Sequence, residues 1–348
     1  MNRTYVGSTI YHLYLAILHL IRDNRESLDI SDENILFLIE STPFIETLIP
    51  NLEKSFFTNV HILSRRREHV DDLGKFNYTF NRKNSLVPYL EDKHPILKKK
   101  KNFIKNSDIY LCDTNSSQSY FLYEFGHVGL NMIEDGARTY AKGPSKFEKI
   151  FKANFTKTLI GSGYDKETTK LFAQFPNKLP IELQKKSVEL NIEKEVAKLD
   201  KKTKKDIFEI FLSYENFELE NKNNALILTQ PISEDGIVKD EEVKINMYRD
   251  LISKVPPHLN VVLKTHPREK TKYEEHFKDI IVLPGLFPIE ILALKEGFYF
   301  EQGYTLFSTA LSNLEIVKEH FFLGKEYLDK FTSQTIKNQI QNMVLDKK

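Results

Sequence analysis

Val261-Val262-Leu263-Lys264-Thr265-His266-Pro267-Arg268 is a short run of aliphatic residues that ends in a histidine and a proline. The run predicts a buried strand. Pro267 biases the residue before it toward an extended backbone, so His266 is expected at the strand tip, aimed out of the sheet. An imidazole ordinarily titrates near neutrality, and Lys264 and Arg268 beside His266 favour an anion. His266 is therefore a candidate proton donor to an anionic group, and the alternative is a partly buried loop histidine.

Similar apolar runs recur along the chain, with amphipathic stretches between them. Strands are expected at residues 34–39, 59–63, 108–112, 127–133, 225–229, 259–264, 279–283 and 297–301. Helices are expected at residues 11–22, 120–125, 241–254, 289–295 and 309–313. This alternation is typical of parallel sheets covered by helices, and two sets of strands predict an α/β fold with two Rossmann-like domains facing a cleft.

Two polar stretches divide the chain. Residues 181–212 are rich in Lys and Glu with apolar residues at helical spacing, which predicts a helical connector. The cluster at residues 221–224 precedes the second set of strands and is typical of a domain boundary. We therefore predict domains at residues 1–220 and 221–348. Ligands bind such sheets beyond the carboxyl ends of the strands, so the loops there carry the candidate site.

The composition excludes several classes of protein. The 348 residues hold 50 Lys and Arg against 49 Asp and Glu, so a formal net charge of +1 gives no general attraction to nucleic acid. A single cysteine, Cys112, excludes an intrachain disulfide and a multi-cysteine zinc site and favours a reducing compartment. The apolar stretch at residues 10–21 is too short to span a bilayer, and no leader is recognised. We expect a cytoplasmic globular protein.

Two acid-Asp-Gly turns follow predicted strands. Glu134-Asp135-Gly136 ends the strand at residues 127–133, and Gly136 permits a sharp turn. A carboxylate at a strand end can accept a proton, which makes Asp135 a candidate base, although turn and helix-cap roles explain it as well. The second turn, Glu234-Asp235-Gly236, places Asp235 in an equivalent position in the second domain.

Two further loops carry groups suited to a nucleotide. Glu290 follows Phe287-Pro288-Ile289 in the first turn of a predicted helix, where it can accept ribose hydroxyls or simply complement the helix dipole. Ser308 and Thr309 are expected to open the next helix after a glycine-containing loop, where N–H groups and hydroxyls can hold a phosphate. N-capping explains them equally well. The chain contains neither a Walker-type nor a G-x-G-x-x-G pattern.

Taken in order, these motifs resemble the bacterial sialyltransferases. With the early Ser8-Thr9-Ile10-Tyr11-His12 and with Leu228-Thr229-Gln230-Pro231 opening the second half, the chain is most similar to the lipooligosaccharide sialyltransferases of glycosyltransferase family 52. The resemblance implies a GT-B type fold and CMP-sialic acid as donor, with a galactose-terminated surface glycan as acceptor. It also implies that no metal or other cofactor is required, and members often form homodimers.

The resemblance, together with the chemistry of the residues, assigns roles within this site. Asp135 is the expected base because the resemblance places the base in the acceptor-side domain at residues 1–220, and Asp235 of the donor-side domain at residues 221–348 remains the alternative. His266 assists the departing phosphate. The donor-binding residues expected are Gly136, Lys264, Pro267, Glu290, Ser308 and Thr309.

Other functions and partners remain open on the sequence alone. A GT-B enzyme that uses another nucleotide sugar and a catalytically silent binding protein are the two alternatives. The basic runs Arg65-Arg66-Arg67 and Lys98-Lys99-Lys100-Lys101 suit anionic lipid headgroups, so peripheral association with the inner membrane is one expectation and solvated loops the other. The aromatic residues fill cores and do not indicate a nucleic-acid surface.

Overall fold

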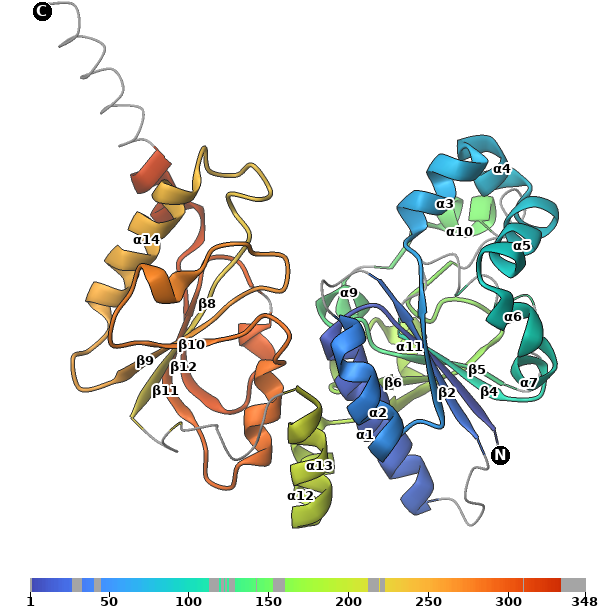
Figure 1. The fold of residues 1–348 in the computed structure, drawn as a ribbon, viewed down its shortest axis with the longest axis horizontal. Helices are drawn as coiled ribbons and strands as arrows, with labels where there is room; N and C mark the ends of the chain where they lie inside the picture. The colour runs from blue at the N-terminus through green and yellow to red at the C-terminus, as the bar shows by residue number, and fades with distance from the viewer. Residues whose placement is uncertain are drawn as a thin grey trace, which may run out of the picture. The chain divides into compact units, whose positions relative to one another are not determined.

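The computed structural model describes most of the chain in two compact units. Unit 1 spans Met1–Ile210 and unit 2 spans Phe211–Lys348. Figure 1 shows each unit as a sheet flanked by helices. The sequence places the domain boundary between residues 220 and 221, which are not described, so that position stays a prediction. The described residues are 2–26, 33–40, 45–112, 119, 122, 124, 129–141, 143–152, 160–211, 219, 223–308 and 310–332.

Unit 1 contains a seven-stranded parallel sheet. Its strand order is β3-β2-β1-β4-β5-β6-β7, so the order reverses between β1 and β4. Ligands of doubly wound sheets bind beyond the carboxyl ends of the strands near such a reversal. The strands are β1 (Arg3–Gly7), β2 (Asn34–Ile39), β3 (Asn59–Leu63), β4 (Asp108–Leu111), β5 (Gly129–Ile133), β6 (Thr168–Ala173) and β7 (Ser187–Glu189).

Burial on both faces explains the apolar strands of unit 1. All six residues of β2 are buried. Phe37 packs in one core cluster with Leu86 of α5 (Arg82–Lys93), and alternation turns Leu36 to the opposite face. Figure 1 shows α5 on one side of the sheet and α1 (Ile10–Glu26) on the other. The sheet is therefore covered on both sides, which requires continuous apolar strands.

Short helices make up the rest of unit 1. They include two 3₁₀ turns, η1 and η3, among the α-helices. In chain order after α1 they are η1 (Ile45–Leu48), α2 (Ile49–Ser55), α3 (Arg66–Leu73), α4 (Lys75–Phe80), α5, α6 (Pro95–Lys99), α7 (Lys101–Lys105), α9 (Ala137–Tyr140), α10 (Lys146–Phe151), η3 (Pro176–Lys178), α11 (Ile181–Gln184), α12 (Ile192–Ala197) and α13 (Lys201–Phe211).

Unit 2 contains a five-stranded parallel sheet in the order β10-β9-β8-β11-β12, which reverses between β8 and β11. Its main helix is α14 (Glu241–Lys254), whose apolar side packs with β8 and β9 in one core cluster. The strands are β8 (Asn224–Leu228), β9 (Asn260–Lys264), β10 (Ile281–Leu283), β11 (Phe300–Thr305) and β12 (Val317–Phe322), and the 3₁₀ turns are η4 (Tyr273–Glu275), η5 (Ile289–Leu294) and η6 (Leu311–Asn313).

The predicted α/β class is confirmed, and several elements match to the residue. The strands at residues 34–39 and 59–63 and the helix at residues 241–254 have the predicted bounds. Most other strands shift by a few residues at their ends, and the stretch at residues 120–125 is described only at residues 122 and 124. Apolar runs therefore located eight of the described strands, whereas β6, β12 and most of the short helices of unit 1 were not predicted.

Four predictions at the element level are wrong. The connector at residues 181–212 also contains the edge strand β7, and the helices at residues 289–295 and 309–313 are the 3₁₀ turns η5 and η6. Four of the six η5 residues are buried, so packing rather than helical periodicity shapes that segment. The predicted strand at residues 297–301 begins at Phe300 and runs to Thr305, so Gly303 lies in a strand and not in a loop. A Cβ on Gly303 would lie 2.6 Å from Leu311 Cδ1, which explains the glycine.

Candidate functional site

Asp135 and His12 are hydrogen-bonded at the carboxyl edge of the unit 1 sheet. Asp135 follows β5, and His12 lies in the first turn of α1, which follows β1. Oδ1 of Asp135 is 2.7 Å from Nε2 of His12. The His12 side chain is 2% exposed and that of Asp135 is 26% exposed. Because β1 and β5 are parallel, their carboxyl ends lie at the same edge and bring together residues 123 positions apart.

The backbone around His12 determines which ring nitrogen carries the hydrogen. Nδ1 accepts the backbone N–H of Ser8 at 3.2 Å. An accepting nitrogen carries no hydrogen, so neutral His12 donates its Nε2–H to Oδ1 of Asp135. The other oxygen, Oδ2, lies 3.9 Å from a nitrogen of the exposed Arg138. Oδ2 is therefore the oxygen better placed to accept a proton from a substrate.

Glu134, directly before Asp135, is buried and held by neutral donors. Oε1 accepts the hydroxyl of Tyr11 at 2.5 Å, and Oε2 accepts the backbone N–H of Gln174 at 2.7 Å and the hydroxyl of Tyr140. Burial, and then the charge of Glu134, raise the pKa of Tyr140. These contacts tie the end of β5 to α1 and to the end of β6, and so fix the backbone that presents Asp135.

Gly136 turns the chain after Asp135 into α9. Its φ of +62° lies in the region that favours glycine. A Cβ there would lie 3.8 Å from the ring of Tyr11, which is ordinary van der Waals contact, so the dihedral rather than space requires glycine. Gly136 therefore shapes the turn. Nothing in the structure tests its expected part in donor binding.

His266 lies directly after β9 in unit 2, at the position that the sequence predicts. Nδ1 accepts the backbone N–H of Arg268 at 3.1 Å, so the neutral ring carries its hydrogen on Nε2. Burial, and then the charges of Arg268 and Lys264, lower the pKa of His266 to about 4. The ligand-free imidazole is therefore a neutral hydrogen-bond donor at neutral pH. An arriving phosphate would favour its protonated form.

The two cations beside His266 are both occupied by protein groups. Buried Lys264 donates to the backbone carbonyls of Thr265 at 2.5 Å and Gly285 at 3.2 Å. Burial lowers the pKa of Lys264 to about 8, opposed by nearby carboxylates.

The loop after β9 packs closely against Gly285. A Cβ on Gly285 would lie 3.0 Å from Cα of Pro267, so a side chain there would displace this loop. Lys264 and Pro267 thus shape the loop that presents His266.

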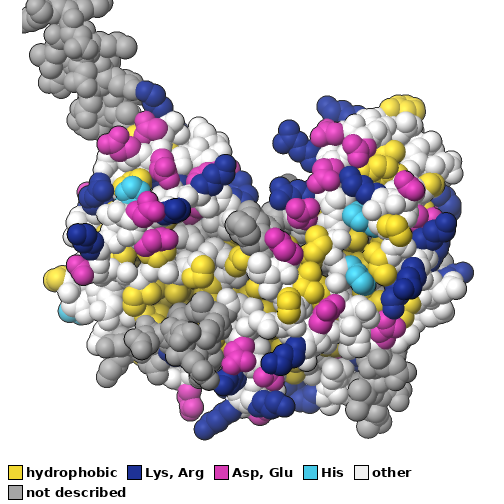
Figure 2. All heavy atoms as spheres, in the orientation of Figure 1, with side chains coloured by type: hydrophobic (Ala, Val, Ile, Leu, Met, Phe, Trp, Pro, Cys, Tyr) yellow, Lys and Arg dark blue, Asp and Glu magenta, His cyan; other side chains and the backbone are white. Residues whose placement is uncertain are grey.

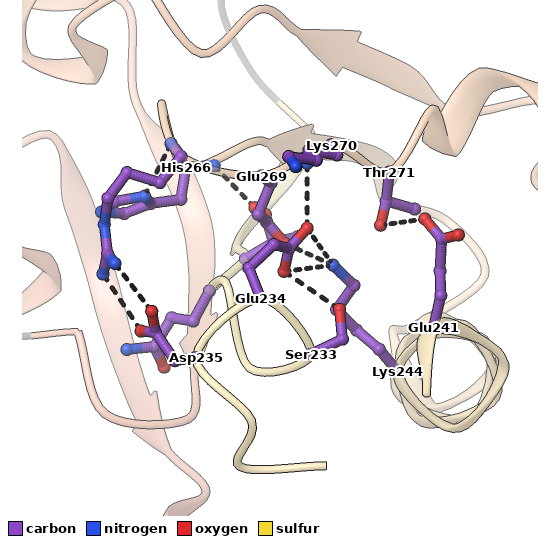
Figure 3. A network of polar contacts seen from close by, with 12 residues as sticks. Ser233, Glu234, Asp235, Glu241, Lys244, His266, Glu269, Lys270 and Thr271 are labelled. Carbon is purple, nitrogen blue, oxygen red and sulfur yellow. Dashed lines mark hydrogen bonds and ion pairs between the residues drawn. The ribbon is translucent and has the colours of Figure 1, made fainter. Parts of the chain in front are cut away.

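Asp235 is clamped by Arg268. Its two oxygens accept the guanidinium nitrogens at 2.7 and 3.1 Å, a bidentate pair. Figure 3 shows Asp235 beside the loop that carries His266, with Glu234 turned inward toward Lys244. The structure therefore brings Asp235 and His266 to one edge of unit 2, where the Asp235 charge is neutralised by a neighbour.

The remaining predicted donor residues lie along the same carboxyl edge. Glu290 is half-buried at the start of η5, and its burial raises its pKa, opposed by its own backbone N–H and by Lys264. Ser308 follows β11, where its N–H donates to Oγ1 of Thr305 at 3.1 Å and its Oγ accepts the N–H of Ala310 at 3.3 Å. Thr309 lies outside the described residues. No α-helix starts at Ser308, so the expected helix N-terminus is wrong, whereas the hydroxyl remains at the edge.

Two contacts of the site were not predicted from the sequence: the contact of His12 with Asp135 and the clamp of Arg268 on Asp235. His12 stands in a quoted motif, but its partner is 123 residues away, so no local spacing indicates the contact. Thr9, whose Oγ1 accepts the N–H of His12 at 3.1 Å, marks the start of α1 and could have placed His12 in the first turn. Arg268 was expected to attract an anion, and the anion it binds here is Asp235.

The sequence of this chain matches a known protein family and another known protein. A model of glycosyltransferase family 52 matches residues 64–323. An uncharacterized protein from Haemophilus influenzae is 27% identical over 230 residues, which are 65% of this chain and 71% of that protein. These matches concern sequence and extend over both units.

Solved structures resemble the fold. The crystal structure of a sialyltransferase from Photobacterium damsela superposes with a TM-score of 0.51 at 13% identity, covering 92% of this chain and 74% of that chain. Likeness at this identity concerns the fold alone. With the two parallel sheets, it confirms an α/β architecture of two Rossmann-like units of the GT-B type.

Proposed function

This chain belongs to glycosyltransferase family 52, and on that premise we propose that it is an inverting sialyltransferase. It transfers sialic acid from CMP-sialic acid to a galactose-terminated glycan of a bacterial surface lipooligosaccharide or capsule. The observation that carries the proposal is the pair of Asp135 and His12, a carboxylate held by a neutral imidazole at the carboxyl edge of a Rossmann-like sheet. Such a carboxylate can take up a proton during transfer.

The acceptor side of the reaction uses Asp135. Oδ2 accepts the proton of the acceptor hydroxyl while the hydroxyl oxygen bonds to the anomeric carbon of sialic acid. His12 keeps Oδ1 occupied through its Nε2–H, so the proton goes to the other oxygen. Attack from the face opposite the leaving group inverts the anomeric centre.

The donor side of the reaction uses His266. The bond between the anomeric carbon and the phosphate oxygen breaks, and CMP leaves with the electron pair. His266 donates its Nε2–H to that phosphate, and the Ser308 hydroxyl supports the growing charge. Lys264 and Arg268 already bind protein groups, which suits one leaving phosphate better than two. A single leaving phosphate carries less charge than a diphosphate, so the proposed reaction relies on His266 and Ser308 rather than on a metal ion.

Donor screening tests this assignment. The protein is incubated with CMP-sialic acid or with uridine and guanosine diphosphate sugars, each with a lactose-like acceptor, and the released nucleotide is measured. Release of CMP together with a sialylated product supports the proposal. Turnover of a diphosphate sugar alone would assign the chain to the alternative glycosyltransferase, and turnover of none would favour a binding protein.

We also propose that the enzyme works in the cytoplasm, at the membrane surface through α3 and α4. No helix in the described part of the chain is long and apolar enough to cross a bilayer. Phe76 and Phe80 of α4 are 72% and 51% exposed, with ring centroids 5.5 Å apart, and Arg66 of α3 stacks over the neighbouring Tyr78 ring. Exposed aromatic rings beside cations suit an anionic lipid interface. A homodimer remains a prediction from family resemblance.

The lysine run at residues 98–101 contributes less to such a surface. Lys100 binds Glu33 at 2.5 Å and Lys101 binds Glu91 at 2.6 Å, so two of its four charges are already paired. Sedimentation with phosphatidylglycerol vesicles, compared with phosphatidylcholine vesicles, tests the proposal. Replacing Phe76 and Phe80 with serine should lower sedimentation with phosphatidylglycerol vesicles, because the exposed rings no longer insert, whereas replacing Lys100 should not.

A further inference from the structure

Lys244 of α14 is a fully buried cation behind the loop that carries His266. Lysine is almost never fully buried unless it is paired. Nζ of Lys244 donates to both oxygens of Glu234 at 2.9 Å and lies 3.6 Å from Oε1 of Glu269. The side chains of Lys244 and Glu269 are 0% and 1% exposed. One cation is thus shared by two carboxylates inside unit 2.

Glu269 connects this cation to His266. Its Oε2 accepts the backbone N–H of His266 at 2.7 Å and the hydroxyl of Thr229, which follows β8. Its Oε1 accepts the hydroxyl of Tyr273 at 2.7 Å. A single carboxylate therefore holds the tip of β9 against the tip of β8. The backbone of His266 is one of its four contacts.

Glu234 connects the same cation to the other end of the loop. Its Oε1 accepts the backbone N–H of Lys270 at 2.9 Å. Burial alone would raise the pKa of Glu234, but the hydrogen bonds from Lys244 and from the N–H of Lys270 lower it to about 2. Figure 3 shows Lys244 reaching between Glu234 and Glu269, with His266 and Lys270 on the loop beyond them.

We propose that Lys244 is a positioning residue: through Glu234 and Glu269 it fixes the loop from His266 to Lys270, and so holds His266 where it can assist the leaving group. Lys244 reaches no reacting atom itself. The inference rests on the role of His266 in the proposed function. It does not depend on which aspartate is the base.

The physical reason lies in the charge balance of the cluster. Without the cation, the buried carboxylate of Glu269 and the partly exposed carboxylate of Glu234 would face each other, and the buried one would be favoured to take up a proton. A protonated Glu269 can no longer accept from both the His266 N–H and its other donors, so the loop would move. Small misplacements of a catalytic group can lower the rate by about 10²-fold.

The test compares Lys244→Met with Lys254→Met. Lys254 lies on the same helix, is 52% exposed and pairs only with Asp250 among the salt bridges of the described residues, so it is a matched control. With CMP-sialic acid, Lys244→Met should lower kcat about tenfold or more and change KM for the donor less than about threefold. Lys254→Met should change neither. A kcat for Lys244→Met within twofold of the parent would overturn the proposal.

A second readout does not depend on the reaction. The pKa of His266 is measured by NMR titration of its ring resonances in the ligand-free protein. Burial is the largest cause of the low pKa of His266, and loosening the loop exposes the ring to solvent, so Lys244→Met should raise that pKa from about 4 by at least about half a unit. An unchanged titration would overturn the inference. A shifted titration without sialyl transfer would instead contradict the proposed function.

Glu269→Gln keeps the proposal testable if Lys244→Met does not fold. Glutamine retains the volume but has no charge and offers one acceptor oxygen in place of two. Either the His266 N–H and the Thr229 hydroxyl, which share Oε2, or the Tyr273 hydroxyl on Oε1 then loses its acceptor, and Lys244 loses one of its two carboxylates. We expect the same pattern, with kcat lowered, donor KM retained and the His266 resonances shifted. Failure of both variants to fold would show that the cluster serves stability alone and would overturn the positioning role.

Discussion

The same tripeptide, Glu-Asp-Gly, follows β5 in unit 1 and occurs in the loop after β8 in unit 2, with different partners. Asp135 accepts a hydrogen bond from the neutral imidazole of His12, whereas Asp235 accepts two from the guanidinium of Arg268. Both glycines adopt a positive φ, +62° for Gly136 and +69° for Gly236. The local backbone requirement is therefore alike, and the difference lies in what each carboxylate meets.

The partners decide which carboxylate can take up a proton. The guanidinium of Arg268 engages both oxygens of Asp235 at 2.7 and 3.1 Å. The imidazole of His12 engages only Oδ1 of Asp135, and Oδ2 has only a nitrogen of the exposed Arg138 at 3.9 Å, so Oδ2 is the oxygen left for a substrate. Glu134 and Glu234, which precede the two aspartates, also differ in whether their partners are neutral or charged. Glu134 is held by tyrosine hydroxyls and an amide, and Glu234 by the ammonium of Lys244. Unit 1 thus presents the candidate base, and unit 2 uses its acids to hold a loop.

The largest expected effect separates the two aspartates. Asp135→Asn keeps the volume of the side chain but removes its ability to take a proton, so kcat should fall about 10²- to 10⁴-fold. Asp235→Asn should retain activity within about threefold because its partner already neutralises it. Rates of CMP release with a saturating acceptor provide the measurement. The reverse result would move the base to unit 2 and make release of Arg268 part of the reaction.

Removing the imidazole partner should have a smaller effect. His12→Phe leaves Asp135 ionisable but no longer fixed at Oδ1, so kcat should fall about 10- to 10²-fold with donor KM retained. His12→Asn, whose amide can still donate, should recover part of that loss. Steady-state kinetics of the two variants give the comparison. Equal activity of His12→Phe and the parent would show that Asp135 needs no partner.

The pH dependence of the stability of unit 2 should report the contacts of Glu234. The pKa of Glu234 is lowered to about 2 in the folded protein, so its contribution is present above its ordinary pKa of about 4.5 and is lost as the pH falls from there toward 2. Glu234→Gln should destabilise unit 2 by about 1–3 kcal/mol at neutral pH. Because glutamine does not titrate, the Glu234→Gln variant should also lose less stability than the parent as the pH falls through this range. Urea unfolding at pH 7, 4 and 3 measures both, and an unchanged pH profile would contradict the assigned contacts.

The smallest expected effect is that of a chelator. Asp135 and Asp235 are each engaged by a protein side chain, and among the residues that the structure describes no group of three His, Cys, Asp or Glu side chains could hold a metal ion. Because the family resemblance implies a metal-independent reaction and the proposed donor leaves with one phosphate, EDTA should leave the rate of sialyl transfer unchanged. If EDTA stops the reaction and magnesium restores it, the leaving group is more consistent with a diphosphate, and the proposed donor is wrong.

Much of the scaffold could be predicted from local sequence. Asn34–Ile39 and Asn59–Leu63 are strands with the predicted bounds because runs of aliphatic residues suit a sheet covered on both faces. His266 lies at its predicted strand end because Pro267 restricts its backbone. The segments at η5 and η6 were predicted less well: four of the six η5 residues are buried, and η6 packs against β11 and β12, so tertiary contacts rather than local periodicity decide their form.

The sequence by itself determined the α/β class, most strand positions and the groups that stand at the strand ends. Only the tertiary structure decided their partners: His12 for Asp135 across 123 residues, Arg268 for Asp235 across 33, and Lys244 between Glu234 and Glu269. Strand formation depends on residues that are neighbours in the chain, so a local sequence pattern can predict it. The protonation of a carboxylate depends on charges and donors within a few ångströms, and in a parallel sheet these come from strands that are distant in sequence.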